Sequence, residues 1–137
     1  MATLTTVRAP QTFSAELGID LFSIEAGLPL DSLATLVELT GMTWADVYQI
    51  VIPARTLKHR RAKRQALSIE ESDRLARVAR TFDHAMRVFG DLERARLWLE
   101  RPKHRFEERT PLQMLVSEMG GRLVEEMLGQ IEHGIFA

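Results

Sequence analysis

The stretch from Ser68 to Gly90 places the strongest constraint on how this chain can fold. Ser68 and Glu71 have the spacing of a capping box, in which each side chain bonds the backbone N–H of the other residue at a helix start. Gly90 is suited to ending such a helix. Between them, apolar residues recur at steps of three or four, which is the spacing of one helix face: Leu75, Val78, Ala79, Phe82, Met86 and Phe89. The pattern predicts one long amphipathic helix over residues 69–89.

Two shorter helices are predicted before this segment. Asp31 or Ser32 can cap the first of them, and Gly41 can end it in a left-handed backbone conformation. Thr43 offers an N-cap oxygen for the second, with Asp46 in the reciprocal position three residues on.

Three more helices are predicted toward the C-terminus. Asp91 can cap the first. Thr110 and Pro111 have the order of an N-cap followed by the first helical residue, so a short helix is expected through Val116. Ser117 begins the last helix, which carries its apolar residues on one side: Met119, Leu123, Val124, Met127, Leu128 and Ile131.

No segment shows the alternating pattern of a β-strand, so the expected fold class is all-α. The chain has 137 residues, of which 45% are hydrophobic and 27% charged, values typical of a globular protein. No apolar run approaches the roughly 20 residues that a membrane span needs, and the first residues do not resemble a signal sequence. The absence of cysteine excludes disulfides and fits a cytoplasmic location.

A basic segment follows the second short helix. Residues 55–64 contain six Lys or Arg and no acidic side chain, whereas the net charge of the whole chain is only -1. Pro53 suits the first turn of a helix, so this segment is expected to form the second helix of a helix-turn-helix unit, with Leu57 facing inward. The expected DNA contacts are Arg55, Thr56, Lys58 and His59 near base edges or phosphates, and Arg60, Arg61, Lys63 and Arg64 at phosphates.

The same charges have a simpler explanation. Basic side chains near the end of a helix interact favourably with its dipole and can just be solvated. Val51 and Ile52 also occupy a turn where many helix-turn-helix units place glycine, so the backbone would have to turn without glycine's freedom. From the residues alone, DNA binding and a solvated helix end both stay open.

Motifs for catalysis or metal binding are weak. The sequence contains neither a Gly-rich phosphate loop nor a G-x-S-x-G motif, and Glu70 and Glu71 are explained by capping. The four histidines, His59, His84, His104 and His133, lie far apart without the spacing of a zinc motif. The first three are flanked by Arg, Lys or Asp, which predicts that their side chains are exposed. We therefore expect no enzyme activity, no cofactor and no metal.

Several blocks of the chain, in this order, resemble the antitoxins of the Xre/MbcA/ParS type. The blocks are ARTLKHRR, LSIEESDRLARVARTFDHAMRVFGDLERARLWLERP and TPLQMLVSEMGGRLVEEMLGQIEHGIFA, and the similarity spans roughly residues 22–137. Their anchors include LS-x-EESDRL, VFGD, A-x-x-WL-x-x-P, TPL and I-E-x-G. The connection over residues 103–109 is more charged than the looser, Gly- or Asn-containing segment of the family.

The resemblance implies an antitoxin of a bacterial type II toxin–antitoxin system. Members of this family are similar to Xre repressors in their N-terminal half, bind toxin through their C-terminal half, and neutralise RES-domain toxins, which consume NAD or use it to modify a target. The implied architecture is a Cro-like helix-turn-helix bundle followed by a helical toxin-binding domain. We expect a flexible arm over residues 1–20, the helix-turn-helix domain over 21–66 and the toxin-binding domain over 67–137. Operator DNA and a second copy of the chain, in a homodimer, are further expected partners.

The last helix and the segment after it are the expected toxin contacts. Residues 118–137 contain four Glu against a single Arg, and a site that binds a dinucleotide pyrophosphate is usually electropositive. We expect this acidic segment to block the toxin's active site, with Gly134 letting the chain leave the helix. The expected toxin-contact residues, which include the apolar anchors, are Glu118, Arg122, Glu125, Glu126, Glu132, His133, Gly134, Ile135, Phe136 and Ala137.

Two alternatives stay open at this level. Phe136 could instead pack back onto Leu128 and Ile131 as part of the core. The whole chain could also be a stand-alone helix-turn-helix transcription regulator without a toxin partner.

Overall fold

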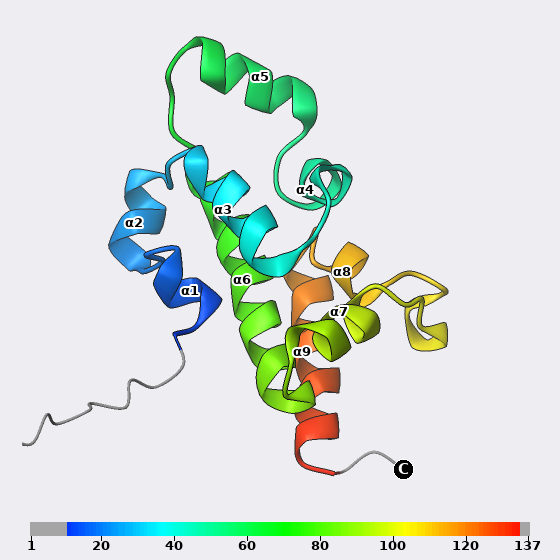
Figure 1. Cartoon of the computed structure of the whole chain (residues 1–137). Coiled ribbons are helices and arrows are strands. Elements are labelled where there is room, and N and C mark those ends of the chain that lie inside the picture. Colours follow the sequence, from blue (N-terminus) through cyan, green and yellow to red (C-terminus); the bar gives the residue numbers. More distant parts are fainter. Residues whose placement is uncertain (1–10, 135–137) are drawn as a thin grey trace, which may run out of the picture.

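The computed structural model describes residues 11–134, and Figure 1 shows how the helices are arranged. This part of the chain is all-α, as predicted, and contains no named strand. In chain order the elements are α1 (Phe13–Glu16), α2 (Leu21–Ala26), α3 (Asp31–Thr40), α4 (Trp44–Ile50), α5 (Ala54–Ala62), α6 (Ile69–Phe89), α7 (Leu92–Leu99), a 3-10 turn (His104–Phe106), α8 (Pro111–Met114) and α9 (Glu118–Glu132).

Helix α6 is the centre of the fold, and α1, α2, α3, α7 and α9 all pack against it. Its predicted capping box is present: the Ser68 hydroxyl accepts from the Glu71 N–H at 3.1 Å, and the Glu71 carboxylate accepts from the Ser68 N–H at 2.8 Å. Gly90 ends the helix with a φ of 90°, in the left-handed region. The predicted bounds of 69–89 are confirmed.

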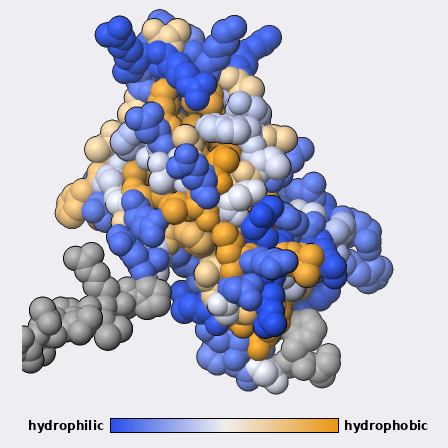
Figure 2. Space-filling model, in the orientation of Figure 1, coloured by the Kyte–Doolittle hydropathy of each residue, from blue (hydrophilic) through white to orange (hydrophobic). Residues whose placement is uncertain are grey.

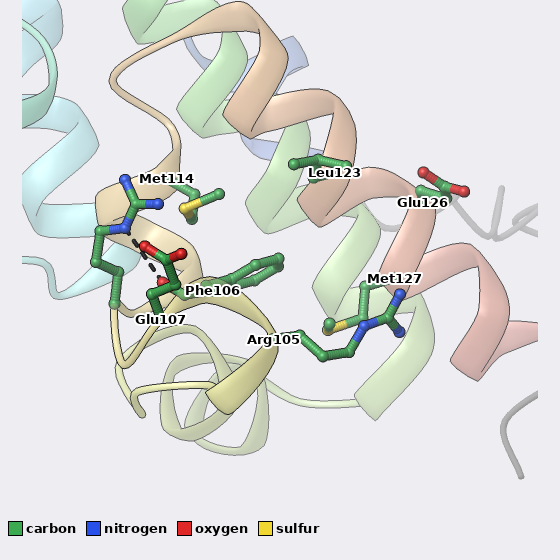
Figure 3. A pocket seen from close by; sticks show the side chains of 8 residues that line it. Arg105, Phe106, Glu107, Met114, Leu123, Glu126 and Met127 are labelled. Atoms are coloured by element: carbon green, nitrogen blue, oxygen red, sulfur yellow. Dashed lines mark hydrogen bonds between the residues drawn. The ribbon is translucent and has the colours of Figure 1, made fainter.

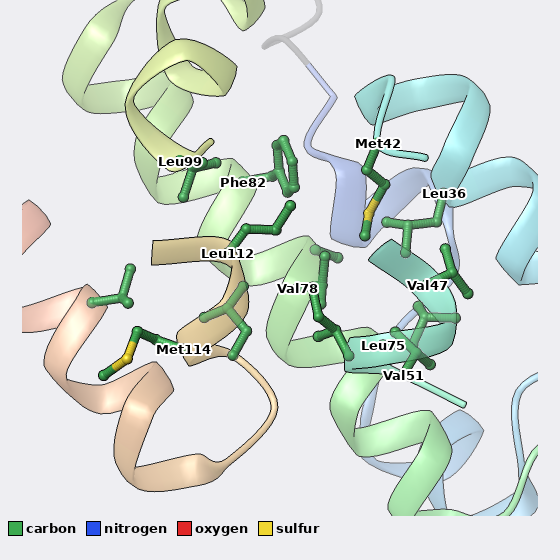
Figure 4. Close-up of a cluster of buried hydrophobic side chains, with 14 of the residues drawn as sticks. Leu36, Met42, Val47, Val51, Leu75, Val78, Phe82, Leu99, Leu112 and Met114 are labelled. Atoms are coloured by element: carbon green, nitrogen blue, oxygen red, sulfur yellow. The ribbon is translucent and has the colours of Figure 1, made fainter. Parts of the chain in front are cut away.

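One apolar core runs through the whole described chain. Phe82 on α6 has no solvent exposure, and the same cluster includes Leu36 of α3, Val47 of α4, Leu99 of α7 and Leu112 of α8 (Figure 4). Burying large apolar side chains in one continuous cluster is the main favourable term in folding. The helices before α6 and those after it therefore stabilise each other through α6.

Polar side chains of α6 fix the positions of its neighbours. The Ser72 hydroxyl accepts from the buried backbone N–H of Leu28 at 2.8 Å, which holds the segment between α2 and α3. Arg77, also buried, donates to the backbone carbonyl of Leu115 at 3.0 Å, which holds the link between α8 and α9. No buried side-chain polar atom in residues 11–134 lacks a hydrogen-bond partner, as expected of a well-specified core.

The N-terminal segment is docked on α6 from residue 13 onward. The Asp83 carboxylate accepts from the backbone N–H groups of Phe13 and Ser14 at 2.7 and 3.2 Å, and from the Ser14 hydroxyl at 2.6 Å. The Phe13 ring packs edge-on against Phe82, with centroids 6.1 Å apart. We expected a loose arm over residues 1–20 with room for one helical turn, which matches the short α1, and did not predict α2, which Asp20 caps. The partner, Asp83, is too distant in sequence for a local pattern to reveal.

Two smaller boundary predictions are wrong. Leu30 precedes the first turn of α3 and makes no side-chain capping bond, so neither Asp31 nor Ser32 caps this helix. Helix α8 ends at Met114 rather than at Val116. The cap at Thr43 and the left-handed Gly41, by contrast, are confirmed.

The apolar stripe of α9 is divided between the core and the surface. Val124 and Leu128 have no exposure, whereas Met119 is 67% exposed and Leu123 42%. The predicted apolar side of α9 is therefore only partly covered by neighbouring elements, which leave Met119 and Leu123 exposed. The first turn of α9 lies very close to α8: a Cβ on Gly120 would lie 2.0 Å from the Met114 carbonyl oxygen.

This close approach makes a prediction about two glycines of α9. Gly120→Ala should lower the free energy of unfolding by about 1–3 kcal/mol, because the new methyl group overlaps backbone that cannot move freely. Gly129→Ala should raise it by about 0.5–1 kcal/mol, because a Cβ there meets no atom within 4 Å and alanine favours helix. Urea denaturation measures both values, and equal effects of the two substitutions would contradict the packing described.

Candidate DNA and toxin interfaces

The turn between α4 and α5 is built without glycine. Val51 has a φ of -103°, so it stays right-handed, and both Val51 and Ile52 are buried in the core. Arg74 of α6 donates to the Val51 carbonyl at 2.9 Å and holds the turn against the central helix. Pro53 follows as the N-cap of α5. The departure from a glycine-containing turn is thus accommodated by apolar packing.

Helix α5 lies at one end of the molecule, where hydrophilic side chains cover the surface (Figures 1 and 2). Leu57 faces the core, as predicted, and Thr56 is half-buried. The helix ends at Ala62, so the last two basic residues of the segment follow it rather than belong to it. Six residues of the expected DNA-contact set are exposed: Arg55, Lys58, His59, Arg61, Lys63 and Arg64.

Arg60 differs from the other basic residues of this segment. Its guanidinium donates from Nε to Glu71 Oε1 at 2.8 Å and from Nη2 to Glu71 Oε2 at 3.2 Å, and it also bonds Gln65. This two-bond geometry is the strongest that an Arg and a carboxylate form. Arg60 therefore connects α5 to the start of α6.

The environment of Glu71 shifts its pKa in a definite direction. Burial of the Glu71 carboxyl by itself raises the pKa, but the bonds and charge of Arg60 and the bonds from Ser68 outweigh burial and lower it. The same pair raises the pKa of Arg60. The sequence indicated the capping role of Glu71, whereas its pairing with Arg60 depends on how α5 returns to α6.

Helix α9, which packs along α6, presents part of the expected toxin-contact set. Glu118 and Arg122 are exposed and bond each other at 3.2 Å, one helical turn apart. Glu126, His133 and Gly134 are exposed as well, and Gly134 has a φ of 66°, so it turns the chain out of the helix as predicted. The remaining members of the set, Ile135, Phe136 and Ala137, lie outside the described residues, as does the alternative packing of Phe136.

The other two acidic residues of α9 turn toward α6. His84, which is buried, contacts Glu125 through Nδ1 and Glu132 through Nε2, the latter at 3.2 Å. The Thr81 hydroxyl donates to Glu125 at 3.2 Å. The expectation that His84 is exposed is wrong: its neighbour Asp83 points elsewhere, because adjacent residues of a helix face different directions. Sequence reasoning missed this cluster entirely.

The charged connection over residues 103–109 closes on itself. The Lys103 N–H donates to the Arg109 carbonyl at 3.0 Å, and Phe106 is buried beneath the loop. Glu107 and Glu108 both have left-handed backbone, with φ of 54° and 67°. The Lys103 ammonium lies 5.0 Å from the centre of the Trp98 ring.

Neither a metal site nor a membrane helix is found in the part of the chain that the structure describes. Within residues 11–134, His, Asp and Glu side chains form no group of three or more that could hold a metal ion. None of the described helices combines the length and apolar character required to cross a membrane.

Comparison with known proteins matches the N-terminal and the C-terminal part of the chain each to a named domain. Residues 22–80 match the antitoxin Xre-like helix-turn-helix domain, and residues 84–134 match the antitoxin Xre/MbcA/ParS C-terminal toxin-binding domain. The first match ends and the second begins within α6.

Relatives that are similar over most of the chain bear one name. The antitoxin Xre of Pseudomonas putida is 49% identical over 111 residues, which cover 81% of this chain and 69% of the relative. The antitoxins Xre of Yersinia enterocolitica and Photorhabdus laumondii are each 32% identical, over 84% and 82% of this chain and 79% and 77% of the relatives. The fold and the two matched domains are those of a toxin–antitoxin antitoxin with a helix-turn-helix. The chain belongs to the Xre family of these antitoxins.

The Arg60–Glu71 pair predicts how stability depends on pH. Because the folded-state pKa of Glu71 lies below its ordinary value of 4.5, the pair contributes fully above about pH 4.5 and is lost as pH falls through the folded pKa. Glu71→Gln should therefore flatten the fall in unfolding free energy between about pH 5 and pH 3. Glu70→Gln, an exposed neighbour, is the matched control. Urea denaturation across this range should show that the unfolding free energy falls with pH in parallel for wild type and Glu70→Gln. The same parallel fall in Glu71→Gln would contradict the stabilising role of the Arg60–Glu71 pair.

The His84 cluster predicts a local effect on α9. His84→Ala should remove the contacts of a buried imidazole with the half-exposed Glu125 and Glu132 and destabilise the protein by about 1 kcal/mol, because each lost hydrogen bond is partly replaced by water. Amide hydrogen exchange should quicken most in the last turns of α9. His104→Ala is the control, since its ring is fully exposed and bonds only Glu108. Unchanged exchange in α9 would show that His84 does not hold this helix.

Proposed function

We propose that this antitoxin neutralises a RES-domain toxin that consumes NAD, and that it does so by blocking the toxin's active site with the end of α9 and the segment after it. The observation that carries the proposal is the exit of the chain from α9. Gly134, at the edge of the matched toxin-binding domain, turns the backbone out of the helix through a left-handed conformation.

Charge supports the second half of α9 as part of the blocking element. Glu126 is exposed there, and an acidic surface is attracted to the electropositive site that binds a dinucleotide pyrophosphate. Glu118, by contrast, lies in the first turn of α9 and pairs with Arg122. Ile135 and Phe136 are the proposed apolar anchors within that site. Glu125 and Glu132 act indirectly in this scheme, because their bonds to His84 fix the direction of the last turns of α9.

A second proposed role is autorepression of the operon through the helix-turn-helix. The exposed basic side chains of α5 occupy the surface that such units present to the DNA major groove. We propose that Arg55, Lys58 and His59 approach base edges or phosphates and that Arg61, Lys63 and Arg64 contact phosphates. Arg60, bonded to Glu71, holds α5 in position for these contacts. Readers of this kind usually bind as dimers to paired half-sites, so a homodimer is part of the proposal, together with a larger complex that includes the toxin.

The proposal assigns no catalytic, cofactor-binding or metal-binding role to this chain, and it places the protein in the cytoplasm. Its division into an N-terminal arm, a helix-turn-helix domain over residues 21–66 and a toxin-binding domain over 67–137 is likewise proposed. In that division α6 belongs to the toxin-binding part, although its first turn carries the partner of Arg60.

Removal of residues 133–137 tests the blocking mechanism. The truncated antitoxin should fail to restore growth to cells that express the cognate toxin, while its free energy of unfolding stays within about 0.5 kcal/mol of the wild type, because the deleted residues follow the packed part of α9. A variant that lacks residues 2–6 controls for shortening of the chain. Full protection by the truncated protein would contradict the proposed blocking of the toxin's active site by these residues.

Charge reversal tests the DNA-binding role. Arg55→Glu combined with Lys58→Glu should weaken binding to DNA from the protein's own promoter. The slope of the logarithm of the binding constant against the logarithm of the salt concentration should become shallower by about 2, because two phosphate or base contacts are lost. Neutralisation of the toxin should be unchanged. The matched control is Arg80→Glu with Arg87→Glu, two exposed arginines of α6. Equal affinity of both double variants for promoter DNA would show that the basic residues of α5 are only solvated.

A further inference from the structure

A groove lies between α9 and the connection over residues 103–109 (Figure 3). It consists of two adjoining hollows of about 230 and 420 Å³, which share Arg105 and Met127. In the smaller hollow, Phe106 from the connection, Met114 from α8 and Leu123 from α9 lie around a common space (Figure 3). The larger hollow continues along α9 and is lined by Trp98, Lys103, His104, Arg105, Met127 and Ile131.

The charge on the two hollows differs. In the smaller one, Glu107 and Glu126 balance Arg105 and Arg109. The larger one is lined by apolar and basic side chains and by no acidic one. Within residues 11–134 neither Lys103 nor Arg105 forms an ion pair. The larger hollow therefore combines apolar contact area with positive charge that no carboxylate of the described chain satisfies.

The backbone of the connection is held in an unusual conformation that shapes this groove. Glu107 and Glu108 are consecutive non-glycine residues with positive φ, a conformation that L-residues adopt only against a steric cost. The Lys103–Arg109 pairing and the buried Phe106 maintain it. Arg105 then lies alongside α9, where it donates to Gln130 at 3.4 Å. Backbone strain of this kind tends to occur at functional sites.

We propose that the larger hollow binds an apolar side chain of the toxin that has a carboxylate beside it. The apolar side chain packs against Trp98, Met127 and Ile131, and the carboxylate pairs with Lys103 and Arg105. Partial burial of Lys103, together with the nearby charge of Arg101, lowers the pKa of the Lys103 ammonium, as expected of a cation that has lost water and gained no carboxylate partner.

The toxin fits this site better than a second copy of the chain. The whole groove lies within the residues that match the toxin-binding domain. At the axis of a two-fold contact between copies a patch faces itself, so a hollow lined by cations and no acid would meet like charge there. The site is distinct from the segment after α9, although the proposal rests on the toxin-blocking function proposed above.

Affinity for the cognate toxin tests the site. The antitoxin assignment leads us to expect the cognate toxin in the reading frame next to that of the antitoxin. Full-length Lys103→Glu and Arg105→Glu should each bind this toxin, once purified, at least about tenfold more weakly than wild type, because each places like charges together. Arg80→Glu, the same charge change on α6, should bind like wild type. Arg105→Gln removes the charge without reversal and should weaken binding less. Thermal unfolding confirms that each variant is folded.

Two outcomes of the affinity measurement would overturn the site, and they are distinguishable. If the wild type binds the toxin tightly and Lys103→Glu and Arg105→Glu bind it equally well, the groove is not a toxin site, and the proposed blocking function is unaffected. Failure of the wild type to bind the toxin rejects the proposed function and the groove with it.

Site-specific crosslinking identifies the occupant directly. The chain contains no cysteine, so His104→Cys introduces a single thiol at a fully exposed position on the larger hollow, which can carry a benzophenone maleimide. Illumination of the antitoxin–toxin complex should attach the toxin to this position and not to an Arg80→Cys control. Attachment to a second copy of the chain, or only to the antitoxin's own residues, would overturn the proposal.

Discussion

The polar side chains of α6 set the geometry on which the rest of the structure depends. An apolar face allows neighbouring helices to slide and rotate, whereas a buried hydrogen bond has one satisfactory partner position. Asp83 fixes α1, and Arg74 fixes the turn between α4 and α5. Arg77 fixes the start of α9, and His84 fixes its end. Helices α5 and α9 are thus each tied to α6 by at least one specific side-chain bond.

This arrangement separates the two interfaces along one rigid element. Glu71 lies in the first turn of α6 and pairs with α5, while His84 lies near its C-terminal end and pairs with α9. The 21 residues of α6 span about 30 Å, so a DNA duplex at α5 and a toxin at α9 need not compete for space. The Thr81–Glu125 and His84–Glu132 contacts advance in the same direction along both helices, which makes α6 and α9 parallel. The end of α9 therefore points away from α5.

Local signals in the sequence were sufficient for most of the helices but not for the contacts that orient them. Caps such as Ser68 and apolar periodicity depend on neighbours a few residues away, so they predict α6 accurately. The burial of His84 and the pairing of Arg60 depend on residues 11 to 48 positions distant, and a periodicity rule assigns such polar side chains to solvent. The exposure of Met119 has the same origin, since a stripe does not reveal how much of it a neighbour covers. The family resemblance supplied the functional class that no local pattern contains.

Inhibition of the toxin's own reaction tests the central claim of this account most directly. The product of the neighbouring reading frame, purified and supplied with NAD, is mixed with increasing amounts of the full-length antitoxin while NAD consumption is followed. The account predicts that NAD consumption stops once the antitoxin reaches a fixed molar ratio to the toxin. Undiminished NAD consumption in the presence of bound antitoxin would contradict blockage of the active site, and a neighbouring protein that leaves NAD intact would contradict the assignment of a RES-type partner.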